Sequence, residues 1–153
     1  MPAMGALLAS VYALHLLFGG LWAGAVMFYT YSLLPLAGDG LDAGALGDAT
    51  GKLTTISRAS AVIQLLTGGY LASPMGVGSA GYWSTTTGVL VVVMVVLWLF
   101  LAALTEMGAG RVRDAIEAGD VRAAGTNARG LLYGASVVAV LLLLEAGALA
   151  GGL

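Results

Sequence analysis

Residues Gly5 to Leu34 form a run of thirty residues without a charged side chain, and Pro35 follows directly. As a helix rising about 1.5 Å per residue, this run would be ~45 Å long, more than the ~30 Å hydrocarbon core of a bilayer. The whole chain is 59% hydrophobic and 9% charged, whereas soluble domains carry roughly 25% charged residues. We therefore expect an integral membrane protein. The N-terminus lacks a basic region, so we expect this first helix to be retained and not cleaved as a signal peptide.

Hydropathy predicts four helical spans in a single domain of residues 1–153. Valine-rich sequence in the third span does not favour strands, because lipid requires helices or closed barrels and barrel strands alternate in polarity. Short connections make neighbouring spans antiparallel, which predicts an up-down-up-down four-helix bundle in the lipid bilayer. The four expected spans cover residues 5–34, 51–72, 83–107 and 128–151.

The basic residues predict the orientation of the bundle. Lys52 and Arg58 lie at the start of the second span, and four arginines lie in or beside the loop of residues 108–127. Cytoplasmic loops of membrane proteins carry the excess of Lys and Arg. We therefore expect loops 36–50 and 108–127 in the cytoplasm and both termini outside, in a multi-pass protein of the cell (plasma) membrane. The net charge of −2 and the lack of a basic run argue against a nucleic-acid partner.

His15 is the one histidine in the chain, and it lies ~15 Å along the first span from Gly5. An intramembrane imidazole is costly, so it indicates a functional site by default. Tyr12, Gly19 and Trp22 follow a three-four-three spacing with His15 and therefore share its helix face. The alternative is a structural histidine that donates to a carbonyl one turn back.

A layer of polar and sulfur-bearing side chains is predicted at the depth of His15. In the four-span arrangement Gln64, Met94 and Glu145 fall with it within roughly 9–17 Å of the outer surface. Such side chains turn inward in a bundle. Glu145 could accept the second ring proton of a metal-bound His15, or it could be protonated and hydrogen-bonded to Gln64. Met94 could be a further metal ligand, and Gln64 could pack helices together. Arg58 snorkels to headgroups, pairs with Glu106, or pairs with an anionic ligand group.

A family resemblance appears in the first two spans. The run LHLLFGGLWAG from Leu14 to Gly24 resembles the first helix of the copper-resistance protein D (CopD) family, and Arg58 with the Thr67-Gly68-Gly69 run resembles its next helix. That superfamily is similar to the HemJ-type membrane protoporphyrinogen oxidase, in which a first-helix histidine ligates haem b. The resemblance implies this role for His15. The oxidase also uses a lysine in a later helix, whereas the lysine here is Lys52 at the cytoplasmic edge, so we expect no oxidase activity.

Three functions remain open from the sequence. The first is haem b binding through His15 for electron transfer or sensing. The second is copper or small-solute transport, although one histidine, no cysteine and no Met-x-x-Met pair form a poor donor set for Cu(I). The third is a structural membrane subunit without a cofactor. Glycine pairs, which allow close helix contacts, also predict a homodimer; these are Gly20/Gly24, Gly130/Gly134 and Gly147/Gly151.

Overall fold

The computed structural model describes residues 2–73 and 76–151, and these residues are helical almost throughout, with no strand among them. The all-helical prediction is confirmed. Short helical turns extend or precede the long helices at two places. The elements are α1 (Pro2–Phe28), the π-helical turn η1 (Tyr29–Leu33), the 3-10 turn η2 (Leu34–Ala37), α2 (Ala43–Ala72), the 3-10 turn η3 (Tyr82–Ser84), α3 (Thr86–Glu117), α4 (Val121–Asn127) and α5 (Arg129–Ala150).

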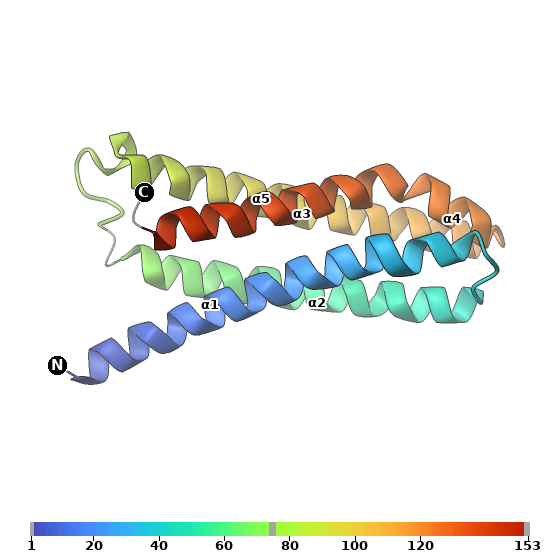
Figure 1. The fold of residues 1–153 in the computed structure, drawn as a ribbon, viewed down its shortest axis with the longest axis horizontal. Coiled ribbons are helices and arrows are strands. Elements are labelled where there is room, and N and C mark those ends of the chain that lie inside the picture. Colours follow the sequence, from blue (N-terminus) through green and yellow to red (C-terminus); the bar gives the residue numbers. More distant parts are fainter. Residues whose placement is uncertain (1, 74–75, 152–153) are drawn as a thin grey trace.

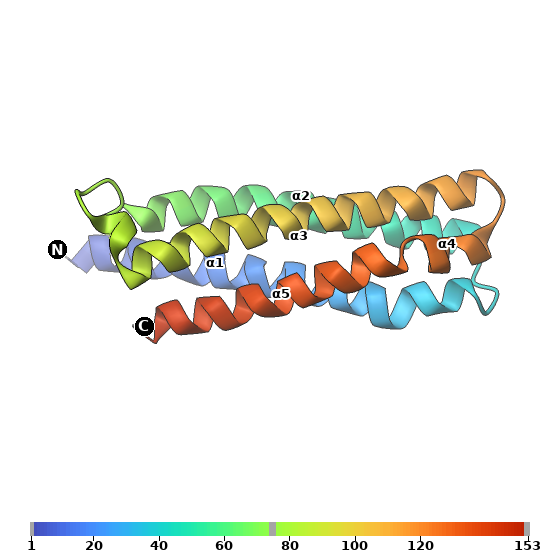
Figure 2. The same ribbon diagram turned by 90° about the horizontal axis from the view of Figure 1, so that it is seen from above.

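Four long helices lie side by side and run alternately in opposite directions (Figure 1). The helices α1 and α3 each contact both α2 and α5, so the four form a closed bundle, seen from above in Figure 2. The described ends of the chain lie at one end of the bundle with the α2–α3 connection, and α4 lies at the opposite end (Figure 1).

Within the described residues, three helices are long and apolar enough to cross a membrane: Gly5–Ala37, Thr86–Glu117 and Arg129–Ala150. They correspond to three of the four expected spans. The helix α2, which contains the other expected span at residues 51–72, is not among them. Asp48, Lys52 and Arg58, together with many small polar residues, lower its hydropathy.

The two loops expected at residues 36–50 and 108–127 are shorter than predicted. Helix α2 begins at Ala43, where the carboxylate of Asp42 accepts a hydrogen bond from the N–H of Ala45 at 3.0 Å. Helix α3 continues to Glu117 and α4 occupies most of the rest, so residues 108–127 are mainly helical. Hydropathy finds the length of helix that suits a bilayer, whereas a capping aspartate and a buried apolar face extend a helix into polar sequence.

The two halves of the bundle are packed differently. In the half that carries the termini, called the terminal half here (residues 5–21, 61–73, 76–100 and 140–151), only Tyr82, Gly88 and Glu145 are buried among the described side chains. The other half, called the packed half, contains the hydrophobic core. Its largest fully buried side chains include Trp22, Tyr29, Leu46, Leu101 and Leu132.

Polar contacts reinforce the packed half. The hydroxyl of Tyr29 lies 2.6 Å from that of Thr50, which itself donates to the carbonyl of Leu46 at 2.7 Å, so Tyr29 is the donor. The guanidinium of Arg58 makes two hydrogen bonds to Glu106, at 2.9 and 2.8 Å. Of the arrangements predicted for Arg58, the structure therefore shows the ion pair with Glu106.

The glycine pairs differ in what surrounds them. A Cβ on Gly134 would lie 3.6 Å from Leu104, whereas Gly20, Gly24, Gly130 and Gly147 have no neighbour within 4 Å of such an atom. These four glycines are not used for close packing within the chain. The homodimer stays a prediction.

Candidate functional site

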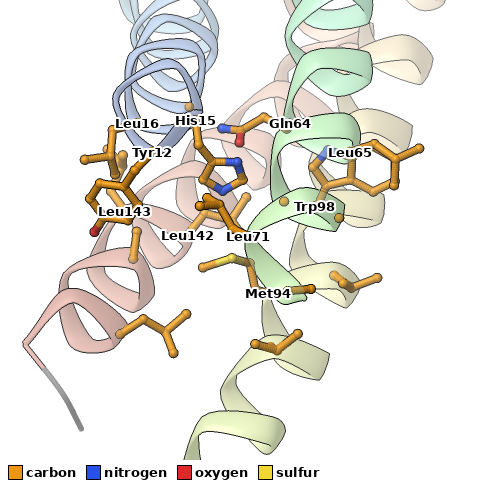
Figure 3. A pocket seen from close by; sticks show the side chains of 18 of the residues that line it. Tyr12, His15, Leu16, Gln64, Leu65, Leu71, Met94, Trp98, Leu142 and Leu143 are labelled. Carbon is orange, nitrogen blue, oxygen red and sulfur yellow. The ribbon is translucent and has the colours of Figure 1, made fainter. Parts of the chain in front are cut away.

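A cavity of about 430 Å³ lies mainly in the terminal half, reaches Trp22 and Leu101 of the packed half, and is lined by residues from all four long helices. Most of the predicted site residues line it: Tyr12, His15, Gly19 and Trp22 from α1, Gln64 from α2 and Met94 from α3. Figure 3 shows His15, Gln64, Met94 and Trp98 around this space.

The imidazole of His15 is held by Thr67 of α2. Its Nδ1 lies 2.8 Å from the Thr67 hydroxyl, and that hydroxyl lies 2.6 Å from the carbonyl of Ile63, to which it donates. A hydroxyl has a single proton to donate. Because Ile63 takes that proton, Thr67 must accept from Nδ1–H of His15. The contacts therefore assign the proton to Nδ1 and leave a lone pair on Nε2, the atom with which a neutral imidazole can bind a metal.

Two glycines let these side chains fit between α1 and α2. A Cβ on Gly68 would lie 3.3 Å from Cε1 of His15, and one on Gly19 would lie 2.5 Å from Nε2 of Gln64. The missing side chain at Gly68 gives the ring room against α2. Gly19 lines the cavity and also makes room for the Gln64 amide.

Several buried polar atoms near the cavity have no hydrogen-bond partner among the described residues. They include Nε1 of Trp22, Nε1 of Trp98 and Oε1 of Gln64, which all belong to residues that line the cavity. Buried polar groups are paired in the great majority of cases, so unpaired ones need an explanation. These three atoms are themselves buried, so they lie behind the surface of the cavity and do not face its open space.

Glu145 is buried, with 8% of its surface exposed, and neither carboxylate oxygen has a partner in the described part of the chain. It does not line the cavity, and Nδ1 of His15 is bonded to Thr67. The predicted Glu145–His15 pairing is therefore not the observed arrangement. Depth along the helix was the basis of that prediction, and depth does not determine the direction in which a side chain points.

Sequence reasoning missed the two residues that complete the site. Thr67 entered only through the family resemblance, and Trp98 was not among the predicted site residues. The spacing held a usable signal for Thr67. Thr67 follows Gln64 by three residues, which places both on neighbouring positions of one helix face, so the helix that presents Gln64 to α1 also presents Thr67.

The donor set around His15 is sparse. Within residues 2–73 and 76–151, no group of three or more His, Cys, Asp or Glu side chains could hold a metal ion. A metal at His15 would thus need ligands that it brings with it. No family model, no curated protein and no solved structure matches this chain.

Proposed function

We propose that this chain is a four-span protein of the cell membrane, of the copper-resistance D type, and that it binds haem b through Nε2 of His15 for electron transfer or sensing. The observation that carries the proposal is the hydrogen-bond chain from His15 through Thr67 to Ile63. It leaves the Nε2 lone pair free beside an apolar cavity between helices.

The residues present fit such a cofactor. The porphyrin supplies its own ring nitrogens, so one imidazole is enough to bind the iron. The cavity volume of about 430 Å³ lies in the range of roughly 300–1,000 Å³ found for small-molecule sites. The Met94 thioether, which lines the same cavity, could be a second axial ligand. The bound haem would supply one-electron redox chemistry.

The surface of α2 supports a fourth membrane crossing. From Lys52 to Ala72 this helix rises about 30 Å, the thickness of a hydrocarbon core. Within that stretch Val62, Leu65 and Leu66 are 57, 62 and 67% exposed, as expected for side chains that face lipid. All six basic residues lie at or beyond Arg58, toward the packed half. By the positive-inside rule this end is cytoplasmic and both termini are outside.

Copper handling is the second candidate, because His15 and Met94 line one cavity and thioether and imidazole both bind copper. With no third donor of the usual kinds beside them in the described residues, this site would hold copper transiently, as a step in transport.

The deciding experiment compares His15→Ala with Ser10→Ala, an exposed position on the same helix. Each protein is expressed with haem precursor and copper supplied, purified, and examined for a Soret absorption band and for iron and copper content. We expect haem in the wild type and in Ser10→Ala and none in His15→Ala, because no other imidazole or thiolate is present. Copper without haem, lost in His15→Ala, would support the second candidate. A wild type with neither would overturn both.

A further inference from the structure

A second cavity, of about 540 Å³, lies in the packed half between α1 and α2. We call it the α1–α2 groove. Alanines at positions 25, 45 and 49 line it, and these small side chains explain why the two helices leave space there. The π-helical turn η1 starts at Tyr29, one of the lining residues. Such turns inside helices are frequently found at functional sites.

The lining of the α1–α2 groove is apolar except for Tyr29 and two charged residues of α2. Phe28, Leu33, Leu53 and Ile56 supply hydrocarbon surface. Tyr29 donates its hydroxyl proton to Thr50 and so offers no free donor. The charged lining residues are Asp48 and Lys52.

Asp48 and Lys52 are exposed, and neither takes part in an ion pair within the described residues, where the pair found is Arg58–Glu106. They are four residues apart on α2, which places the two charges about 6 Å apart along the helix axis. Lys52 is nearer the terminal half, and Asp48 is farther from it.

This order of groups matches one side of a bilayer. In the membrane placement proposed above, Lys52 lies at the cytoplasmic edge of the hydrocarbon core. Ile56 then lies about 6 Å inside the core and Asp48 about 6 Å outside it. Along α2, moving from the core toward the cytoplasm, the groove presents the apolar side chain of Ile56, then the cation of Lys52, then the anion of Asp48.

We propose that the α1–α2 groove binds a phospholipid of the cytoplasmic leaflet with a primary ammonium headgroup, that is, a phosphatidylethanolamine. An acyl chain lies against Phe28 and Ile56, the phosphate accepts from the ammonium of Lys52, and the lipid ammonium donates to Asp48. An acidic headgroup has no cation for Asp48, and a choline headgroup has no N–H to donate. This proposal rests on the membrane placement and is independent of haem.

The test is native mass spectrometry of the full chain in mild detergent with equal amounts of phosphatidylethanolamine, phosphatidylglycerol and phosphatidylcholine of the same acyl chains. We expect wild type to retain phosphatidylethanolamine over the other two by roughly fivefold, since an exposed ion pair contributes up to about that factor. Asp48→Asn should abolish the preference, and Lys52→Gln should lower retention of all three lipids. Asp39→Asn and Arg122→Gln, which replace exposed residues outside the groove, should behave as wild type.

Equal retention of the three lipids, or a preference for phosphatidylglycerol, would overturn the proposal. So would an Asp48→Asn protein that keeps the wild-type preference, or an Asp39→Asn protein that loses it. The haem content of the four variants should equal that of wild type, so a negative lipid result leaves the His15 proposal standing. A negative haem result likewise leaves the lipid measurement valid.

Discussion

Replacing Thr67 by valine tests how His15 is prepared for binding. Valine has nearly the shape of threonine but lacks the hydroxyl that lies 2.8 Å from Nδ1 of His15. In the variant, Nδ1 loses its acceptor and the ring is no longer held in one tautomer. Some of the imidazoles will then carry their proton on Nε2, where it blocks a bond to iron. The carbonyl of Ile63 loses only the side-chain donor.

The size of the effect follows from two estimates. Removing an outer partner of a metal-binding histidine typically costs 10–100-fold in affinity, or about 1.4–2.8 kcal/mol. Leaving a buried donor unsatisfied costs about 1–3 kcal/mol. His15 lines a cavity that has room for water, so water can replace some of the lost bonding. We therefore expect the low end, roughly a tenfold weaker haem affinity.

The assay is titration of haem into the purified apoprotein, followed by its Soret band, for wild type, Thr67→Val and Thr67→Ser. Serine keeps the hydroxyl and should restore affinity to near the wild-type value. The midpoint potential of the bound haem should also change in Thr67→Val, because the Nδ1 hydrogen bond raises the basicity of the ligand. Equal affinity and potential in Thr67→Val and wild type would refute the reasoning, as would a serine variant as weak as the valine one.

Two further predictions concern the rest of the bundle. Glu145→Leu should raise the thermal unfolding temperature, because it removes a buried carboxyl that has no partner among the described residues, a cost of about 1–3 kcal/mol. A thermal scan in which Glu145→Leu unfolds earlier than wild type would contradict this account. Glu145→Gln should keep bound cofactor. Cysteines at Ser79 and Ala118, both exposed in a chain without natural cysteine, should react with an impermeant thiol reagent from opposite sides of intact cells, Ser79 from outside; labelling from one side would refute the four-span arrangement.

The helices were predictable because lipid leaves the backbone so few choices. A run such as residues 5–34 without a charge has to form a helix if it crosses a bilayer. The same reasoning underestimated the lengths of α2 and α3, because hydropathy gives the length of helix inside the bilayer and not the full length of the helix. Asp42 starts α2 eight residues before the expected span, and Ala109 and Val112 are fully buried beyond the expected end of α3.

The candidate site was predictable in membership and less so in contacts. The spacing of Tyr12, His15, Gly19 and Trp22 placed them on one face, and all four line the cavity. Depth also brought Gln64 and Met94 to the same place. Glu145 lies at the predicted depth but does not line the cavity, because depth does not determine the rotation of a side chain about the helix axis. Predicting the contact between Thr67 and His15 would have required the rotation of α1 relative to α2, and hydropathy does not give that rotation.

The uneven packing of the bundle has a consequence for the life of the chain after synthesis. The packed half can fold around its own side chains, whereas the terminal half has few buried apolar contacts to hold it closed. Regions with few such contacts open locally at low cost, and a ligand that binds only the closed form stabilises it by mass action. If the proposed haem binding holds, newly made protein without haem would therefore be loose in its terminal half, and proteases would distinguish empty from filled molecules there.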